Sequence, residues 1–130
     1  MHAASRWRTV GIALAIGAAY DLAFAVMILA FTRKAAALMG LSVPADPVYL
    51  HLNGIFLLLL AGLYAAAARE PARYRAVAAI AGAGRLLGGA YFVWSWAGGQ
   101  PRAFLGLGLG DLALGAATLV AWRRASVVSD

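Results

Sequence analysis

The sequence predicts an all-α polytopic membrane protein, a single domain over residues 1–130 in which four transmembrane helices form a bundle. Three observations lead to this prediction. Hydrophobic residues make up 64% of the chain and charged residues 12%, with a mean hydropathy of +0.81, whereas soluble domains hold about 45–50% apolar and 25% charged residues. The apolar residues gather in four runs of about 20, enough to cross a hydrocarbon core of about 30 Å. All 4 prolines lie between the runs, where a missing backbone donor interrupts no helix.

The first run covers residues 10–31 and follows two basic residues, Arg6 and Arg8. A secretory signal peptide has the same order of charge and apolar run. However, its apolar part is only about 7–15 residues long, and here Asp21 interrupts the run. We therefore expect the first run to be retained as a membrane span.

The longest connection, residues 32–47, separates the first run from the second, which covers residues 48–68. Its segment 34–40 is predicted either to continue the first helix by a turn or to form a short amphipathic piece at the outer interface. This segment is the strongest candidate for a lid.

The third and fourth runs cover residues 76–97 and 103–122. Trp94 and Trp96 lie at one end of the third run, and Trp122 lies at the far end of the fourth. Because tryptophan rings favour the headgroup level of a bilayer, these positions predict an aromatic belt at each face of the membrane.

Basic residues flank the four runs unevenly. Seven arginines share one side and three basic residues the other: Arg6, Arg8, Arg69, Arg73, Arg75, Arg123 and Arg124 against Arg33, Lys34 and Arg102. By the positive-inside rule, both termini are predicted to be cytoplasmic, in a multi-pass protein of the cell (inner) membrane. Membrane topology and contacts with lipid headgroups then explain the net charge of +6, so no nucleic-acid partner is expected.

The chain offers few metal ligands or nucleophiles. It has no cysteine, which excludes disulfides, thiolate metal sites and a cysteine nucleophile. His2 and His51 lie on different segments without the spacing of a histidine metal site. We predict neither a metal site nor a catalytic residue.

Three charged residues, Asp21, Arg85 and Asp111, fall near the middle of the first, third and fourth runs. Each costs about 2.5–3.5 kcal/mol at a helix centre, so three unpaired charges would weigh roughly 8–10 kcal/mol against insertion. They are therefore expected to pair, because one planar guanidinium can donate to two carboxylates. Small residues share their helix faces and predict that the charges point into the bundle: Gly17, Ala81, Gly88, Gly89, Gly108, Gly115 and Thr118. The G-x-x-x-G pairs Gly84/Gly88 and Gly106/Gly110 predict close helix contacts.

Other polar residues outline a path from the outer face to this cluster. His51 and Asn53 lie near the outer end of the second run, and Tyr20 and Tyr91 add hydroxyl groups. The alternatives are interfacial hydrogen bonding for His51 and a bond to a neighbouring helix for Asn53. For the charged cluster itself two interpretations stay open, a structural ion network and a binding site for a ligand, proton or substrate.

Several segments resemble the small four-helix bacterial membrane proteins grouped as DoxX-like, namely residues 49–64, 68–71 (Ala-Arg-Glu-Pro), 84–88 (Gly-Arg-Leu-Leu-Gly) and 110–113 (Gly-Asp-Leu-Ala). The resemblance implies a four-helix bundle. Because some DoxX-like proteins are implicated as accessory subunits of quinone-linked redox systems, it also implies a quinone or a membrane complex as partner. Analogy of fold does not by itself transfer function.

These observations predict a non-enzymatic integral membrane protein that binds a small lipophilic molecule, a quinone or lipid, at Asp21, Arg85 and Asp111. The alternative is an accessory or structural subunit of a larger membrane complex, or a homo-oligomer, in which glycine-rich faces dock a partner. The third option is a small transporter or membrane enzyme, and the chain is short for alternating access unless it dimerises.

Overall fold

The computed structural model describes residues 2–127, and this part of the chain forms five helices and no strand. The helices are α1 His2–Ala30, α2 Thr32–Leu38, α3 Val48–Arg69, α4 Arg75–Ala97 and α5 Arg102–Ser126. α1, α3, α4 and α5 are each long and apolar enough to cross a membrane. They leave many large apolar side chains exposed, among them Leu59, Ile80 and Leu87. This surface is compatible with a multi-pass membrane protein.

The four predicted runs agree with the four long helices, and the largest differences lie at the chain ends. α1 begins eight residues before the predicted run, and α5 continues four residues beyond it to Ser126. Trp7 of α1 and Ala125 of α5 are buried in the same apolar cluster. Contacts between helices therefore stabilise the ends of α1 and α5 that extend beyond the apolar runs.

α2 is a separate helix, so segment 34–40 does not continue α1, and its predicted place at the outer interface stays a prediction. The chain leaves the helical conformation at Phe31, with φ −130° and ψ 43°. α2 ends at Leu38, and the chain turns away at Gly40, whose φ of +69° suits glycine; Leu41 N–H donates to the Ala36 carbonyl at 2.9 Å. Gly99, with φ +104°, ends α4 in the same way.

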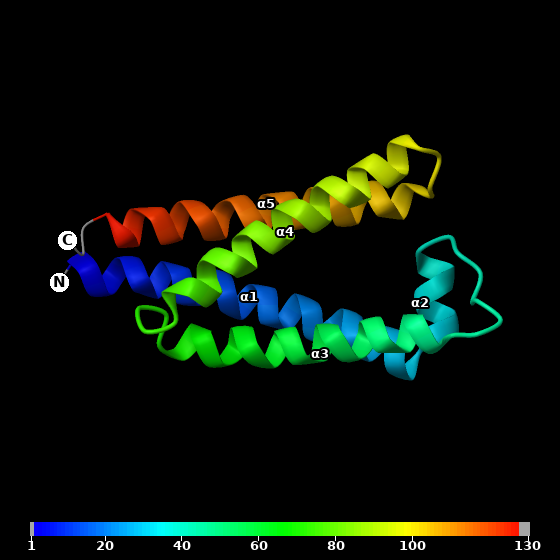
Figure 1. Ribbon diagram of the computed structural model, residues 1–130, viewed down its shortest axis with the longest axis horizontal. Coiled ribbons are helices and arrows are strands. Elements are labelled where there is room, and N and C mark those ends of the chain that lie inside the picture. The colour runs from blue at the N-terminus through cyan, green and yellow to red at the C-terminus, as the bar shows by residue number, and fades with distance from the viewer. Residues whose placement is uncertain (1, 128–130) are drawn as a thin grey trace.

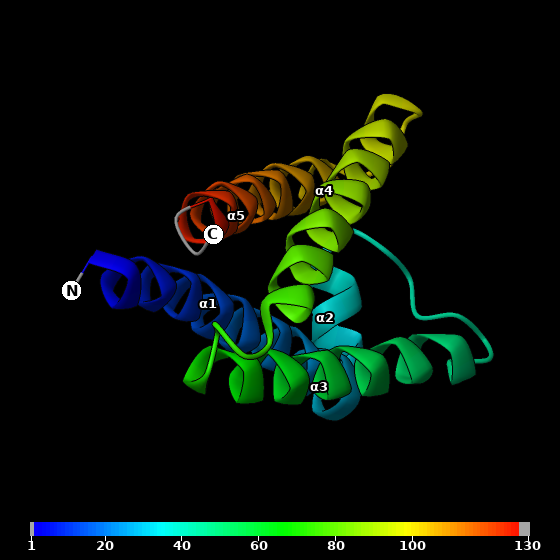
Figure 2. The same ribbon diagram turned by 60° about the vertical axis from the view of Figure 1, so that its left-hand side comes forward.

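The long helices form two pairs, α1 with α3 and α4 with α5, and the contact between α1 and α5 joins them. In Figures 1 and 2 the pairs meet near the chain termini and diverge toward α2. At that end α2 reaches from the α1–α3 pair to the α4–α5 turn (Figure 1), where a Cβ on Gly40 would lie 3.0 Å from Pro101 Cβ.

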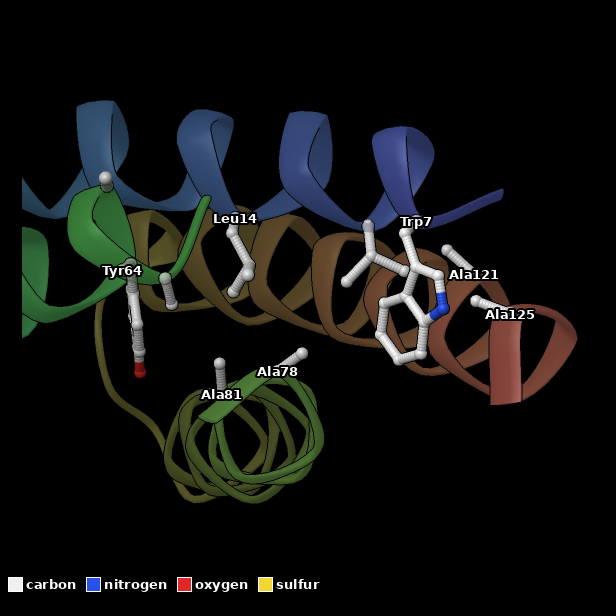
Figure 3. Packing of buried hydrophobic residues seen from close by; sticks show 10 residues of the cluster. Trp7, Leu14, Tyr64, Ala78, Ala81, Ala121 and Ala125 are labelled. Atoms are coloured by element: carbon white, nitrogen blue, oxygen red, sulfur yellow. The ribbon is translucent and has the colours of Figure 1, made fainter. Parts of the chain in front are cut away.

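The hydrophobic core that all four long helices share lies toward the termini. Ten buried residues from all four long helices form it (Figure 3): Trp7, Val10, Leu14, Ala18, Tyr64, Ala67, Ala78, Ala81, Ala121 and Ala125. We call this part of the molecule the terminal half and the remainder, which includes α2, the α2 half. In the α2 half each pair buries its own interface, and a Cβ on Gly54 of α3 would lie 2.8 Å from Leu29 of α1.

Glycines set the distance between α4 and α5, but not the ones in the G-x-x-x-G pairs. A Cβ on Gly89 would lie 2.8 Å from the Gly108 carbonyl oxygen, and one on Gly115 would lie 2.9 Å from that of Gly82. Each contact is therefore backbone against backbone. The prediction from Gly84 and Gly106 is wrong, because no described atom lies within 4 Å of a Cβ at either position. The contacting glycines are seven residues apart on each helix, a spacing that returns to the same helix face after two turns.

Candidate functional site

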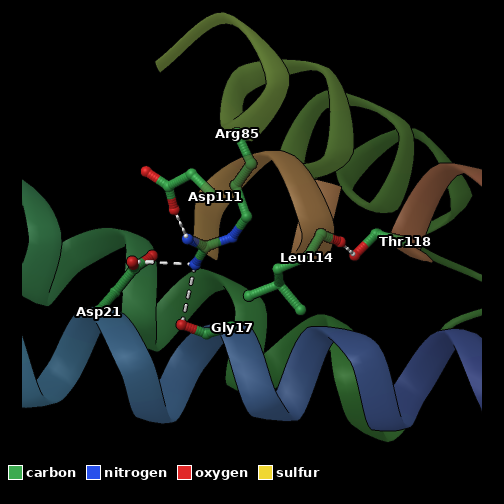
Figure 4. A network of polar contacts seen from close by, with 6 residues as sticks. All are labelled: Gly17, Asp21, Arg85, Asp111, Leu114 and Thr118. Atoms are coloured by element: carbon green, nitrogen blue, oxygen red, sulfur yellow. Dashed lines mark hydrogen bonds and ion pairs between the residues drawn. The ribbon is translucent and has the colours of Figure 1, made fainter. Parts of the chain in front are cut away.

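Arg85 joins the two helix pairs, as Figure 4 shows. Its side chain extends from α4 and is 9% exposed. Nη1 donates to Asp111 Oδ1 of α5 at 2.8 Å, and Nη2 lies 2.9 Å from Asp21 Oδ1 of α1. The predicted Asp–Arg–Asp arrangement is therefore present, with one guanidinium between two carboxylates.

Gly17 supplies a third acceptor for the guanidinium. Arg85 Nη2 donates to the Gly17 carbonyl at 3.0 Å, one turn before Asp21 on α1. A Cβ at this position would lie 3.1 Å from the same nitrogen. The small residue predicted to share the face of Asp21 thus lets the guanidinium reach the backbone of α1, a contact that sequence reasoning did not anticipate.

Two tyrosine rings contact the guanidinium. Arg85 Cζ lies 5.3 Å from the ring centroid of Tyr20 on α1 and 5.8 Å from that of Tyr64 on α3, distances typical of cation–π contacts. Tyr20 was predicted near the cluster and Tyr64 was missed. Tyr64 lies three residues from Ala61 and from Ala67, two other buried residues of α3, so the helical period of small residues was the signal for it.

The cluster carries one more negative than positive group. Each aspartate uses only one carboxylate oxygen, so the Oδ2 atoms of Asp21 and Asp111 have no hydrogen-bond or ion-pair partner among residues 2–127. The Asp21 side chain is 6% exposed and that of Asp111 is 14% exposed. Asp111 therefore keeps an acceptor that a donor from outside the protein can reach.

The cluster lies where the shared core ends. Ala18 of α1 and Ala81 of α4 belong to the core and lie about one turn before Asp21 and Arg85 respectively. Beyond them the helix pairs diverge (Figure 1). Thr118 is the other buried polar residue nearby, and its hydroxyl donates to the Leu114 carbonyl of its own helix at 2.7 Å (Figure 4).

The remaining predicted site residues lie away from the cluster. His51 Nε2 is 3.1 Å from Thr32 Oγ1 of α2, and that hydroxyl donates its one proton to the Ile28 carbonyl at 2.7 Å. We therefore assign the proton of this bond to His51 Nε2. This bond joins α3 to α2. His51 lies 13 residues, or about 20 Å along α3, from Tyr64. Asn53 and Tyr91 are exposed, and the structure brings neither to Arg85.

Two grooves open at the terminal half, on either side of α1. The α1–α3 groove, of about 850 Å³, is bordered by Arg8, Arg69, Glu70 and Arg73. The α1–α5 groove, of about 810 Å³, is bordered by Arg6, Arg123 and Arg124. Neither Arg85 nor its two aspartates line either groove.

Within residues 2–127, no group of three or more His, Cys, Asp or Glu side chains is placed to hold a metal ion. No protein-family model matches the chain, and no curated protein or solved structure was found to match it. The resemblance to DoxX-like proteins therefore stays a prediction.

Proposed function

We propose that this chain is a four-span protein of the cell (inner) membrane that binds a small lipophilic molecule, such as a quinone or a lipid, beside Asp21, Arg85 and Asp111. Both termini are cytoplasmic in this proposal. The positions of the arginines support it, because the termini and the α3–α4 turn lie at the same end of the molecule (Figure 1). The seven arginines that favour a cytoplasmic location flank this end.

The observation that carries the proposal is the free carboxylate oxygen of Asp111 at the edge of a buried ion cluster. Ionisable residues at membrane depth are costly and usually serve a site. Here two carboxylates share one guanidinium, so the cluster retains capacity to accept hydrogen bonds. A lipophilic molecule with a hydroxyl or other donor group complements it, and a carbonyl group can accept from the Nε–H of Arg85, which has no hydrogen-bond partner among residues 2–127.

The surroundings also suit an apolar ligand. The rings of Tyr20 and Phe24 of α1 pack at a tilt of 49° with centroids 4.8 Å apart, next to the cluster on the side where the pairs diverge. α2 spans the far end of this side through the contact of Gly40 with Pro101. The molecule would enter from the lipid between the helix pairs, with its polar group at Asp111 and its apolar part toward α2.

Native mass spectrometry of the protein purified in a mild detergent tests this function. We expect a stoichiometric lipophilic adduct that is lost in Asp111→Asn, which keeps the shape of the side chain but removes its charge. Thr118→Val is the matched control, because this buried polar residue on the same helix bonds only its own backbone. An unliganded wild-type protein, or an adduct retained in Asp111→Asn, contradicts the proposal.

A second candidate function, an accessory subunit of a membrane complex, has one observation in its favour. Gly84 of α4 and Gly106 of α5 are exposed, and no described atom lies within 4 Å of a Cβ at either position. These surfaces can admit the backbone of another helix. If a partner docks there, the partner should no longer copurify with the Gly84→Leu variant. It should still copurify with the Asp111→Asn variant, even though that variant has lost the lipophilic adduct.

A further inference from the structure

The two grooves of the terminal half differ in the state of their arginines. In the α1–α3 groove Arg73 Nη1 donates to Glu70 Oε2 at 3.3 Å, and this hydrogen bond raises the pKa of Arg73. The α1–α5 groove has three arginines and no carboxylate among its described lining residues. Arg6, Arg123 and Arg124 form no ion pair with any residue in the described part of the chain. The α1–α5 groove is therefore the more strongly cationic of the two.

The arginines of the α1–α5 groove lie at its terminal end, together with Val127, and the residues deeper in the groove are apolar apart from Thr9. Arg123 and Arg124 belong to the last turn of α5, whereas Val120 and Ala117 line the groove one and two turns deeper. Ala117 is about 10 Å from Arg124 along the helix axis. The groove thus changes from cationic to apolar in the direction of the membrane interior, as an anionic lipid requires.

We propose that the α1–α5 groove binds an anionic phospholipid, with its phosphate held by Arg6, Arg123 and Arg124 and an acyl chain along Ala117 and Val120. Guanidinium groups suit this role because they present paired N–H donors to phosphate oxygens. The apolar part of the groove selects a lipid over a soluble phosphate. Its volume of about 810 Å³ falls within the range of about 300–1,000 Å³ for small-molecule sites. The inference rests on the membrane placement proposed above but not on ligand binding at Arg85.

The test is a titration of the detergent-solubilised protein with phosphatidylglycerol and, separately, with phosphatidylcholine, in which native mass spectrometry counts the bound lipids. We expect the wild-type protein to retain phosphatidylglycerol in preference to phosphatidylcholine. Arg123→Gln/Arg124→Gln should weaken phosphatidylglycerol binding about 10- to 30-fold, because each arginine near an anionic surface contributes up to roughly fivefold.

The matched control is Arg69→Gln/Arg73→Gln, which removes two positive charges from the same end of the molecule but from the α1–α3 groove. This variant should bind phosphatidylglycerol within about twofold of wild type. Equal losses in the two variants would mean a general attraction of the basic end for anionic lipid, and that result overturns the proposed site.

Two measurements on the unmodified protein complete the test. Phosphatidylglycerol retention should fall as the NaCl concentration rises, because screening weakens exposed ion pairs, and retention indifferent to salt contradicts a role for the arginines. Inorganic phosphate should not displace the lipid; displacement at equal concentration would identify a free-anion site instead.

Discussion

The terminal half and the α2 half consist of the same four long helices, yet they are held together differently. In the terminal half all four helices share one core, in which Leu14 of α1 is buried with Ala78 of α4. In the α2 half each pair has its own interface, and Gly89 and Gly108 bring α4 and α5 together without help from α1 or α3. The Asp21–Arg85–Asp111 cluster lies at the boundary between the two halves.

This difference shows that a buried charged cluster can lie at the edge of a hydrophobic core, where packing shared by all four helices ends. Apolar packing toward the termini fixes the relative position of the helix pairs. At the boundary, the pairs are joined by charge-assisted contacts of Arg85 with α1 and α5. Beyond it, α2 connects the pairs through Gly40 and Pro101. The terminal half is therefore the part that a core shared by all four long helices holds together, and under the proposed function the α2 half is the part that would adjust to a ligand.

The largest effect is expected from Arg85→Ala, which removes the connection at the boundary. Two carboxylates would be left without a cation in a buried site, a loss of about 3–5 kcal/mol of unfolding free energy. Unfolding by sodium dodecyl sulfate in mixed micelles measures it. The triple variant Asp21→Asn/Arg85→Met/Asp111→Asn should recover most of this loss, because no buried charge remains. Equal stability of Arg85→Ala and wild type would contradict an ion cluster at the boundary.

A smaller effect is expected from Gly108→Ala, which acts on the α4–α5 interface in the α2 half. Its Cβ would lie 2.9 Å from the Gly89 carbonyl oxygen, so the helices must separate, at a cost of about 1–3 kcal/mol. Gly106→Ala is the control two residues away, where no described atom lies within 4 Å of a Cβ. Under the same unfolding assay this control should equal wild type or gain up to about 1 kcal/mol. Equal losses at the two positions would refute the assigned interface.

Gly40→Ala should cost about 1–2 kcal/mol, because φ of +69° disfavours a residue with a Cβ. Gly99→Ala carries a similar backbone cost, but a Cβ there meets no described atom within 4 Å. Only Gly40→Ala should also disturb Pro101. Amide hydrogen exchange over residues 39–47 should therefore accelerate in Gly40→Ala and not in Gly99→Ala. Identical exchange in both variants would show that the contact with Pro101 does not hold α2.

The smallest effect is expected from His51→Ala, which breaks the bond between α3 and α2. Hydrogen bonds between membrane helices average about 0.6 kcal/mol, so global unfolding should change little. Hydrogen exchange in α2 is the more sensitive measurement and should accelerate. Asn53→Ala, at an exposed position two residues further along α3, should leave it unchanged. If hydrogen exchange in α2 were also faster in Asn53→Ala, loss of the bond between His51 and Thr32 would not be the cause of the faster exchange.

The pairing of Asp21, Arg85 and Asp111 was predictable from sequence because few partners can neutralise a charge at mid-depth of an apolar helix. Gly17 was predicted as a packing residue, but its carbonyl as an acceptor for Arg85 was not. Tyr64 was missed because α3 has aromatic and leucine residues on several faces, and the spacing of Ala61, Tyr64 and Ala67 was the signal for its buried face. His51 was placed near the end of its span, but its bond to Thr32 depends on where α2 begins.

The sequence alone determined the four long helices and the ion cluster. Both follow from local quantities, the length of an apolar run and the free energy of an unpaired buried charge. Only the tertiary structure decided which glycines meet and where the pairs diverge. Gly82, Gly89, Gly108 and Gly115 make the α4–α5 contact while Gly84 and Gly106 do not. The reason is physical: each helix carries small residues on more than one face, and the rotation of one helix against another selects the face that packs.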